Sequence, residues 1–186
     1  MKLSIGVDCG LDGGVVSLDE NSLILLREPF PAVKAGKGRK VDLRALSDIF
    51  SMFASSKYEV SVTIEDPGAH APSASGLRSM TYCFAVVEMV CVAHGLRYHT
   101  VYAQNWQKQF WTRPKMKIIR YDDKNLDKQG NPKPIREKFD TKAAALMACG
   151  RLWPNETWRL SSRHSKPHDG LIDAALIAEY GRLNNL

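Results

Sequence analysis

The stretch "SIGVDCGLDGGVVSLDE", residues 4–20, decides the fold of this chain. A strand pattern over residues 3–9 leads through the turn sequence GLDGG into a second strand pattern over residues 14–18. Asp8 lies inside the otherwise apolar first strand, whereas Asp12 lies in the turn, where an acid is common. Burying a carboxylate in a sheet is costly unless something pairs with it. The stretch therefore predicts an antiparallel hairpin and raises the question of what pairs with Asp8.

The rest of the chain extends this hairpin into a larger sheet. Residues 22–28 form a third strand pattern, which makes an antiparallel meander. Period-2 and period-3.6 patterns then predict strands over residues 59–65 and 97–103, and helices over 41–54, 76–95, 105–111, 140–154 and 167–183. This order predicts an α/β protein with a mixed five-stranded sheet and helices on both faces. It is the element order of the ribonuclease H-like fold.

Size and composition are those of an ordinary globular protein. The 186 residues are 44% hydrophobic and 25% charged, so we expect one domain over residues 1–186 with a substantial core. There is no run of eighteen apolar residues and no signal-peptide pattern, so we expect no membrane association. The four cysteines form no CxxC pair, which favours reduced thiols in a cytosolic protein.

Positive charge is concentrated in two segments. The chain has a net charge of +6. Residues 106–138 alone account for a net charge of the same value. A second basic run, KAGKGRKVDLR, covers residues 34–44. Clustered positive charge favours a polyanionic partner, although a solvated loop has the same composition. Because residues 112–138 show no clear period, we predict a long basic loop or insertion there.

Four acids occupy places where a purely structural sequence would favour other residues. Asp8 lies in the first strand, and Glu65 ends the strand over residues 59–65. Asp169 and Asp173 are four residues apart in the last helix, so they share one face. Because the residues around Asp173 on that helix are apolar, we expect its side chain to face inward. Singly, Glu65 could begin a loop and Asp169 could interact with the helix dipole.

Together the four acids favour a metal site. Converging carboxylates repel one another unless hard cations lie between them, and oxygen ligands suit Mg²⁺ or Mn²⁺. Two such ions roughly 3.5–4 Å apart can activate a water and stabilise the leaving 3′ oxygen of a phosphodiester. The basic segments would hold the phosphate backbone while the acids hold the metals. The composition and the acids therefore predict a two-metal nuclease.

Five segments of the chain resemble, in the same order, the RuvC-like Holliday junction resolvases of the ribonuclease H-like superfamily. The match covers most of the chain, so five short motifs in order form a specific signal. The run AGKGRKVD and the ending H-D-G-x-x-D resemble phage and chloroplast members more than the common bacterial ones. The segments are IGVDCGLDGGVVSLD, VTIEDPGAH, VYAQNWQKQFW, DTKAAALMACGRLWP and KPHDGLIDAALIAEYGR.

The resemblance implies a homodimeric, Mg²⁺-dependent endonuclease that makes paired nicks in four-way DNA junctions. Asp8, Glu65 and Asp173 match the family's acidic positions. The common bacterial pattern has its fourth acid where this chain has Gly170, so Asp169 is assigned in its place, with His168 as the competing choice. The resemblance also implies a location in the cytoplasm of a bacterium or phage-infected cell, or in an organelle if a transit peptide has been removed.

Further contacts with the substrate follow from the basic residues. Lys166 and His168 are candidates for contact with the scissile phosphate. The apolar residues of the helix over 76–94 indicate core packing and, by the resemblance, contact with a second subunit, whereas Trp106 is assigned to the core. The candidate DNA contacts are Lys37, Arg39, Lys40, Arg78, Lys108, Arg113, Lys115 and Lys117.

Three other interpretations compete with a resolvase. Sugar kinases and actin share the opening motif but need two such domains, for which this chain is too short. A ribonuclease H that cuts RNA–DNA hybrids usually carries its Glu on the first helix, whereas residues 41–54 contain only Asp42 and Asp48 as acids. A nucleic-acid-binding protein without activity is the third interpretation, and the presence of all four acids counts against it.

Overall fold

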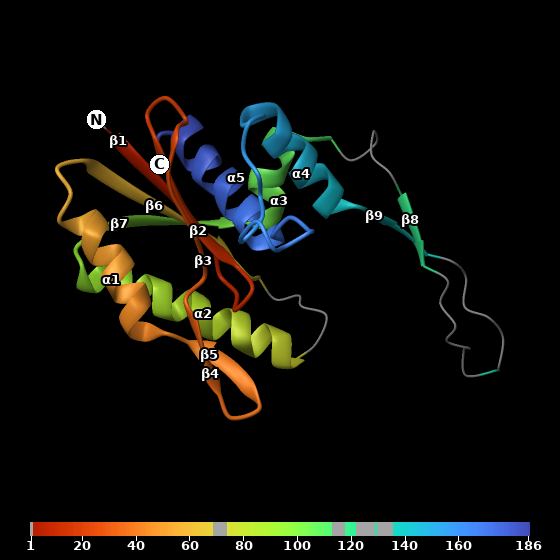
Figure 1. Ribbon diagram of the computed structural model, residues 1–186, viewed down its shortest axis with the longest axis horizontal. Coiled ribbons are helices and arrows are strands. Elements are labelled where there is room, and N and C mark those ends of the chain that lie inside the picture. Colours follow the sequence, from red (N-terminus) through yellow and green to blue (C-terminus); the bar gives the residue numbers. More distant parts are fainter. Residues whose placement is uncertain (1, 69–73, 113–117, 122–128, 130–135) are drawn as a thin grey trace.

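A five-stranded mixed sheet lies at the centre of the protein, as a computed structural model shows for residues 2–68, 74–112, 118–121, 129 and 136–186 (Figure 1). The strand order is β3-β2-β1-β6-β7. β1, β2 and β3 form an antiparallel meander, and β6 and β7 continue the sheet in parallel with β1. The mixed sheet predicted from the sequence is therefore confirmed. The strands are β1 (Lys2–Asp8), β2 (Gly14–Asp19), β3 (Ile24–Pro29), β6 (Glu59–Asp66) and β7 (Arg97–Tyr102).

Helices cover both faces of this sheet, as predicted, and enclose two separate cores. On one face, α1 and α2 pack over Ile5, Val7 and Ile64. On the other face, α3, α4 and α5 pack over Val16 and Leu18. These helices are α1 (Leu43–Ala54), α2 (Ala74–Ala93), α3 (Ala103–Phe110), α4 (Thr141–Leu152) and α5 (Asp169–Leu183).

α5 lies directly against the backbone of β1. A Cβ atom at Gly6 would lie 2.1 Å from the carbonyl oxygen of Ala174 and 2.3 Å from the amide nitrogen of Ala178. No side chain fits between the strand and the helix at this point, because real Cβ atoms do not approach a backbone so closely. This close approach places the first turns of α5 beside the end of β1, where Asp8 lies.

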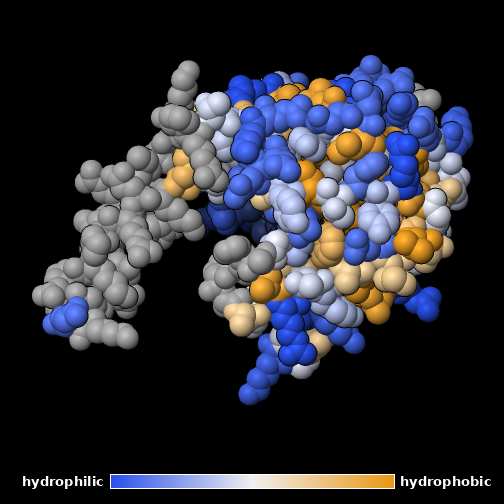
Figure 2. Space-filling view, turned by 180° about the vertical axis from the view of Figure 1, so that it is seen from behind, coloured by the Kyte–Doolittle hydropathy of each residue, from blue (hydrophilic) through white to orange (hydrophobic). Residues whose placement is uncertain are grey.

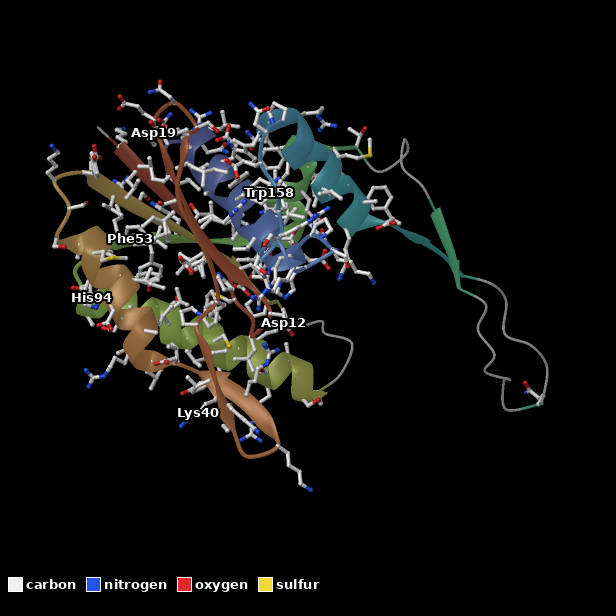
Figure 3. All side chains as sticks on the ribbon, in the orientation of Figure 1. Asp12, Asp19, Lys40, Phe53, His94 and Trp158 are labelled. Atoms are coloured by element: carbon white, nitrogen blue, oxygen red, sulfur yellow. The ribbon has the colours of Figure 1, made fainter. Side chains whose placement is uncertain are left out.

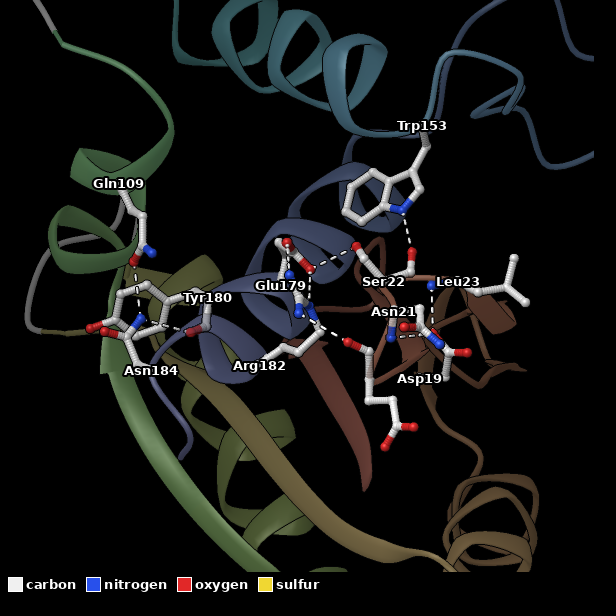
Figure 4. A network of polar contacts seen from close by, with 11 residues as sticks. Asp19, Asn21, Ser22, Leu23, Gln109, Trp153, Glu179, Tyr180, Arg182 and Asn184 are labelled. Carbon is white, nitrogen blue, oxygen red and sulfur yellow. Dashed lines mark hydrogen bonds and ion pairs between the residues drawn. The ribbon is translucent and has the colours of Figure 1, made fainter. Parts of the chain in front are cut away.

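A polar network fixes the other end of α5 to the β2–β3 turn (Figure 4). The buried Glu179 accepts two hydrogen bonds of 2.7 Å from the guanidinium of Arg182 and one of 2.8 Å from the hydroxyl of Ser22. The indole of Trp153 in turn donates to the Ser22 carbonyl oxygen at 2.7 Å. A buried carboxylate of this kind is stable because a charge and a hydrogen bond both compensate it.

Two hairpins stand outside the central sheet. β4 (Ala32–Ala35) and β5 (Gly38–Val41) form an antiparallel ribbon within the basic run at residues 34–44. The predicted helix over 41–54 therefore begins later, at Leu43, after the N-cap residue Asp42. β8 (Ile118–Tyr121) and β9 (Arg136–Phe139) pair within and beside the stretch 112–138; that this stretch is an insertion stays a prediction.

α2 has a buried side and an exposed apolar side. Cys83, Val87 and Cys91 are buried against the sheet and α1, whereas Tyr82, Met89 and Val92 are 53–65% exposed. By length and composition α2 is apolar enough to cross a membrane, although the sequence pattern predicted no such segment. Figure 2 shows hydrophobic side chains on the rear face of the molecule, on the side where α2 lies.

Candidate active site

Asp8 and Glu65 end two adjacent parallel strands at the same edge of the sheet. The register pairs Val7 of β1 with Ile64 of β6, so the next residue of each strand is an acid. The two carboxylates are close enough for the charge of Asp8 to raise the pKa of Glu65, and both side chains are only partly accessible to solvent. The carboxyl ends of parallel strands are a common position for ligand sites in such sheets.

The first two turns of α5 bring the other two acids to this edge. Asp173 is largely buried and feels the charges of Asp8, Glu65 and Asp169, as expected for an inward-facing residue. Asp169, one helical turn earlier, is exposed and forms an ion pair with Lys142. The four predicted acids are therefore brought together, with Asp169 at the rim.

The packing of Gly170 leaves no room for a side chain at that position. A Cβ atom at Gly170 would lie 2.3 Å from the Asp12 carbonyl oxygen and 2.5 Å from the Gly13 Cα atom. α5 thus touches the turn that follows β1, and no acid fits at residue 170. The preceding residue, Asp169, is free to project from the helix at the edge of the site.

Burial and mutual repulsion raise the pKa values of the three inner acids. Desolvation, followed by the charges of Asp12 and Asp169, raises the pKa of Asp8 from 3.8 to about 7. Desolvation and the charge of Asp8 raise the pKa of Glu65 from 4.5 to about 8, although a hydrogen bond from Trp106 opposes the rise. Desolvation and the neighbouring carboxylates raise the pKa of Asp173 well above 3.8. A bound cation would stabilise the ionised carboxylates of such a site, because it replaces the water that burial has removed.

Trp106 positions Glu65, a role that our sequence analysis missed. The indole nitrogen Nε1 of Trp106 donates a hydrogen bond of 2.9 Å to Glu65 Oε2. Trp106 is 1% exposed and packs edge-to-face on Trp111 at 5.7 Å between ring centroids. The core assignment of Trp106 is confirmed. A buried indole N–H needs a hydrogen-bond acceptor, and this requirement was the only indication in the sequence that Trp106 contacts an acid.

For the nuclease that the sequence predicts, the Trp106→Phe variant is expected to cleave DNA about 10-fold more slowly, because outer partners of metal-binding carboxylates typically contribute 10–100-fold. The lost hydrogen bond lowered the pKa of Glu65, so its removal should also move the rising limb of the pH–rate profile to higher pH. Trp111→Phe, which removes a packed indole with no hydrogen bond to Glu65, is the matched control. An unchanged profile in Trp106→Phe would show that the hydrogen bond does not position Glu65.

Lys142 is a second residue that sequence reasoning missed. It lies in the first turn of α4, after the N-cap Asp140, whose carboxylate accepts a hydrogen bond of 3.0 Å from the Ala143 amide. Its ammonium forms the ion pair with Asp169, and its charge also lowers the pKa of Asp173. A cation at the rim of an acidic site is suited to a phosphate group, and the sequence DTK at a helix start was its only signal.

The donor set fits divalent cations of the Mg²⁺ class. All four side chains offer carboxylate oxygens, and the three inner ones carry repulsion that a hard cation relieves. Within the part of the chain that the structure describes, no group of three or more His, Cys, Asp or Glu side chains is yet placed to hold a metal ion. Glu65 accepts the hydrogen bond from Trp106, and Asp169 pairs with Lys142, so Asp169 must leave Lys142 before it can bind a metal ion.

The predicted phosphate contacts, His168 and Lys166, lie at the start of α5 and in the loop before it. His168 is the N-cap of α5, and its Nδ1 accepts a hydrogen bond of 3.2 Å from the Leu171 amide. The cap uses only one ring nitrogen of His168, so the assignment of Asp169 rather than His168 as the fourth group stays a prediction. Lys166 is exposed in the loop that precedes α5.

The predicted DNA contacts are spread over several elements. Lys37, Arg39 and Lys40 belong to the β4–β5 ribbon, Arg78 to α2 and Lys108 to α3, and all five are exposed. Their contact with DNA stays a prediction at this point. Arg113, Lys115 and Lys117 lie outside the residues that the structure describes.

Solved structures with this fold include RuvC of T. thermophilus in complex with a Holliday junction substrate. It matches with a TM-score of 0.61 and 13% identity, over 100% of this chain and 95% of that one. A second RuvC structure, from Thermus thermophilus, matches with a TM-score of 0.53 and 13% identity, over 98% and 96% of the two chains. No protein-family model and no curated protein matches this chain. The likeness shows the fold, and the predicted RuvC-like, ribonuclease H-like architecture is thereby confirmed.

Proposed function

We propose that this protein is a Mg²⁺-dependent endonuclease that makes paired nicks in four-way DNA junctions. The observation that carries the proposal is the convergence of Asp8, Glu65 and Asp173 at one sheet edge, in a fold shared with RuvC bound to a Holliday junction. The net charge of +6 supports a polyanionic substrate. The closer kinship with phage and chloroplast members stays a prediction from the sequence.

Asp8, Glu65 and Asp173 would hold the metal ions, with Asp169 completing the set at the rim. Two ions bound there would supply Lewis-acid activation of the attacking water and of the leaving 3′ oxygen, with Mn²⁺ able to replace Mg²⁺. Trp106 fixes the orientation of Glu65 through its 2.9 Å hydrogen bond. Lys142 offers a cation to a phosphate oxygen once Asp169 turns away from it, and His168 orients the start of α5.

The exposed side of α2 suits a second copy of this chain. Tyr82, Ala85, Met89 and Val92 are exposed at helical spacing and form one stripe. Pairing of two such stripes about a two-fold axis would bury them and give two active sites related by that axis. A four-way junction has the same symmetry, so a dimer could place one site on each of two strands.

Three labelled substrates test this proposal: a four-way junction, a linear duplex of the same sequence and an RNA–DNA hybrid. With Mg²⁺ we expect paired cuts in the junction that leave 5′-phosphate and 3′-hydroxyl ends, and with EDTA we expect none. Cutting of the hybrid alone would favour a ribonuclease H, and equal cutting of duplex and junction would rule out a resolvase. Sedimentation of the wild type beside Met89→Glu tests the dimer in the same preparation.

The Lys142→Gln variant is expected to cleave the junction about 100-fold more slowly, because a preorganised cation at a reacting phosphate contributes about 10²–10³-fold. Lys57→Gln, which removes an exposed lysine after α1, is the control and should cleave normally. A Lys142→Gln variant that cleaves the junction as fast as the wild type would show that Lys142 does no more than pair with Asp169.

A further inference from the structure

The β4–β5 ribbon presents a dense array of positive charge beside the candidate active site. Lys34, Lys37, Arg39 and Lys40 are all exposed within its ten residues, 32–41. The ribbon projects from the core between the end of β3 and the start of α1 (Figure 1). It carries no acid and no aromatic side chain in residues 32–41. An array of this composition suits a phosphate backbone and offers no surface on which a base could stack.

The register of the ribbon divides its cations between two faces. Lys34 pairs directly with Arg39, and Val33 pairs with Lys40. Because side chains alternate along a strand, Lys34 and Arg39 share the face that also carries the buried Val41, whereas Lys40 belongs to the opposite face. Like charges directly opposite each other destabilise a strand pair, so the Lys34–Arg39 pair gains from an anion placed between them.

Arg39 already reaches the turn of the active-site hairpin. Its guanidinium forms an ion pair of 2.6 Å with Asp12, four residues after Asp8. Figure 3 shows Asp12 at the end of the β1–β2 hairpin that faces the ribbon, with Lys40 labelled on the ribbon itself. The side chains are 49% and 85% exposed, and an ion pair so exposed to water is weak and readily exchanged.

An open groove of about 610 Å³ lies between the ribbon and His168, and its lining also includes the acids Glu28 and Asp42. Arg39 and Ala32 line it on the ribbon side, and Asp12 and His168 line it on the side of the metal site. His168 immediately precedes Asp169, so the groove runs from the ribbon to the rim of the site. Among the described residues, Lys34 has no ion-pair partner at all.

We propose that the ribbon is a phosphate clamp, in which Arg39 at the edge of this groove and Lys34, its cross-strand partner outside the groove, bind two phosphates of one DNA strand. Arg39 exchanges Asp12 for a phosphate when DNA binds, so Asp12 acts as a competing anion that holds the arginine in place beforehand. The clamp is a positioning device and touches no reacting atom. This inference rests on the proposed function, because it takes DNA as the polyanion.

The salt dependence of junction binding tests the clamp. We expect the slope of log K against log salt, measured in EDTA by fluorescence anisotropy, to fall by about 1.8 in the Lys34→Gln/Arg39→Gln variant, at about 0.9 for each lost phosphate contact. The loss should be equal for two junctions of different sequence. The control variant Lys57→Gln/Arg97→Gln removes the same amount of charge where β6 and β7 begin, at the end of these strands away from the acids. It should leave the slope nearly unchanged.

Asp12→Asn provides a test with the opposite sign. Freeing Arg39 should tighten junction binding several-fold, and this gain should largely disappear in the Asp12→Asn/Arg39→Gln variant, as a double-mutant cycle would show. If the wild type binds the junction but the slope does not change in the ribbon variant, the clamp is wrong and the proposed function is unaffected. A wild type that binds no DNA would overturn the proposed function itself. Equal melting temperatures of the variants would confirm that all are folded.

Discussion

The Asp8→Asn variant is expected to lose about 10³-fold or more of its cleavage activity and to bind a four-way junction as tightly as the wild type or more tightly. Asp8 acts on both other inner acids, because its charge raises the pKa values of Glu65 and Asp173. Removing a metal ligand removes the chemistry that the metal supplies. Removing a negative charge also reduces repulsion of the DNA phosphates. Rates on labelled junctions and anisotropy in EDTA measure the two effects separately.

The same variant is expected to be more stable than the wild type in EDTA at pH 8. The pKa of Asp8 is about 7 in the folded protein, whereas the ordinary pKa of an aspartate, which we take for the unfolded chain, is 3.8. Because the folded value is the higher one, the wild type loses stability as the pH rises from about 4 through 7, by about 2–4 kcal/mol. Asn carries no charge at either pH, so we expect a melting temperature at least about 4 °C higher at pH 8 and little difference at pH 3.5.

Asp48→Asn is the matched control for both effects. Asp48 is an exposed acid on α1, so its amide variant makes the same chemical change away from the site. It should cleave normally and should melt at the wild-type temperature at both pH values. An Asp8→Asn protein that still cuts the junction would show that Asp8 is not a metal ligand. A variant that cuts nothing but also gains no stability would contradict the repulsion inferred for the metal-free site.

The sheet could be predicted because its signals are local. Alternation in residues 59–65 and the glycine turn after Asp8 determine strands without reference to distant residues. Their parallel pairing then brings Asp8 beside Glu65, and inward orientation of α5 adds Asp173. Acids in apolar surroundings are visible in a sequence because burial of a charge is costly. The three inner acids were therefore accessible to sequence reasoning.

The partners of these acids were not accessible in the same way. Trp106 has the pattern of a core residue in every local respect, and its contact with Glu65 spans 41 positions. Lys142 and Asp169 are 27 positions apart and meet only because α4 packs on α5. The ribbon differs, because its two-residue turn begins at Gly36 with φ of +58°, and such a Gly-X turn between alternating residues is a known hairpin signal. The run is rich in Lys and Arg, a composition that is also typical of solvated loops, so its two strands were not predicted.

The Gly6→Ala variant is expected to lose about 3 kcal/mol or more of its free energy of unfolding, with a loss of metal binding as well. The added methyl group would meet the Ala174 carbonyl oxygen at 2.1 Å and the Ala178 amide nitrogen at 2.3 Å. Both are backbone atoms of α5, so no flexible side chain can make room, and overpacking of this kind typically costs about 1–3 kcal/mol or more. α5 must move away from β1, and Asp173 moves with it.

Gly150→Ala is the matched control, because it makes the same substitution inside α4 where a Cβ atom would meet nothing within 4 Å. There the loss of backbone freedom in the unfolded chain should raise stability by about 0.4–1 kcal/mol. Urea unfolding measures both variants, and the rise in melting temperature on adding Mg²⁺ reports the metal site. We expect that rise in Gly150→Ala and not in Gly6→Ala. If Gly6→Ala unfolded like the wild type, α5 would not lie against β1, and this contact would not hold Asp173 beside Asp8.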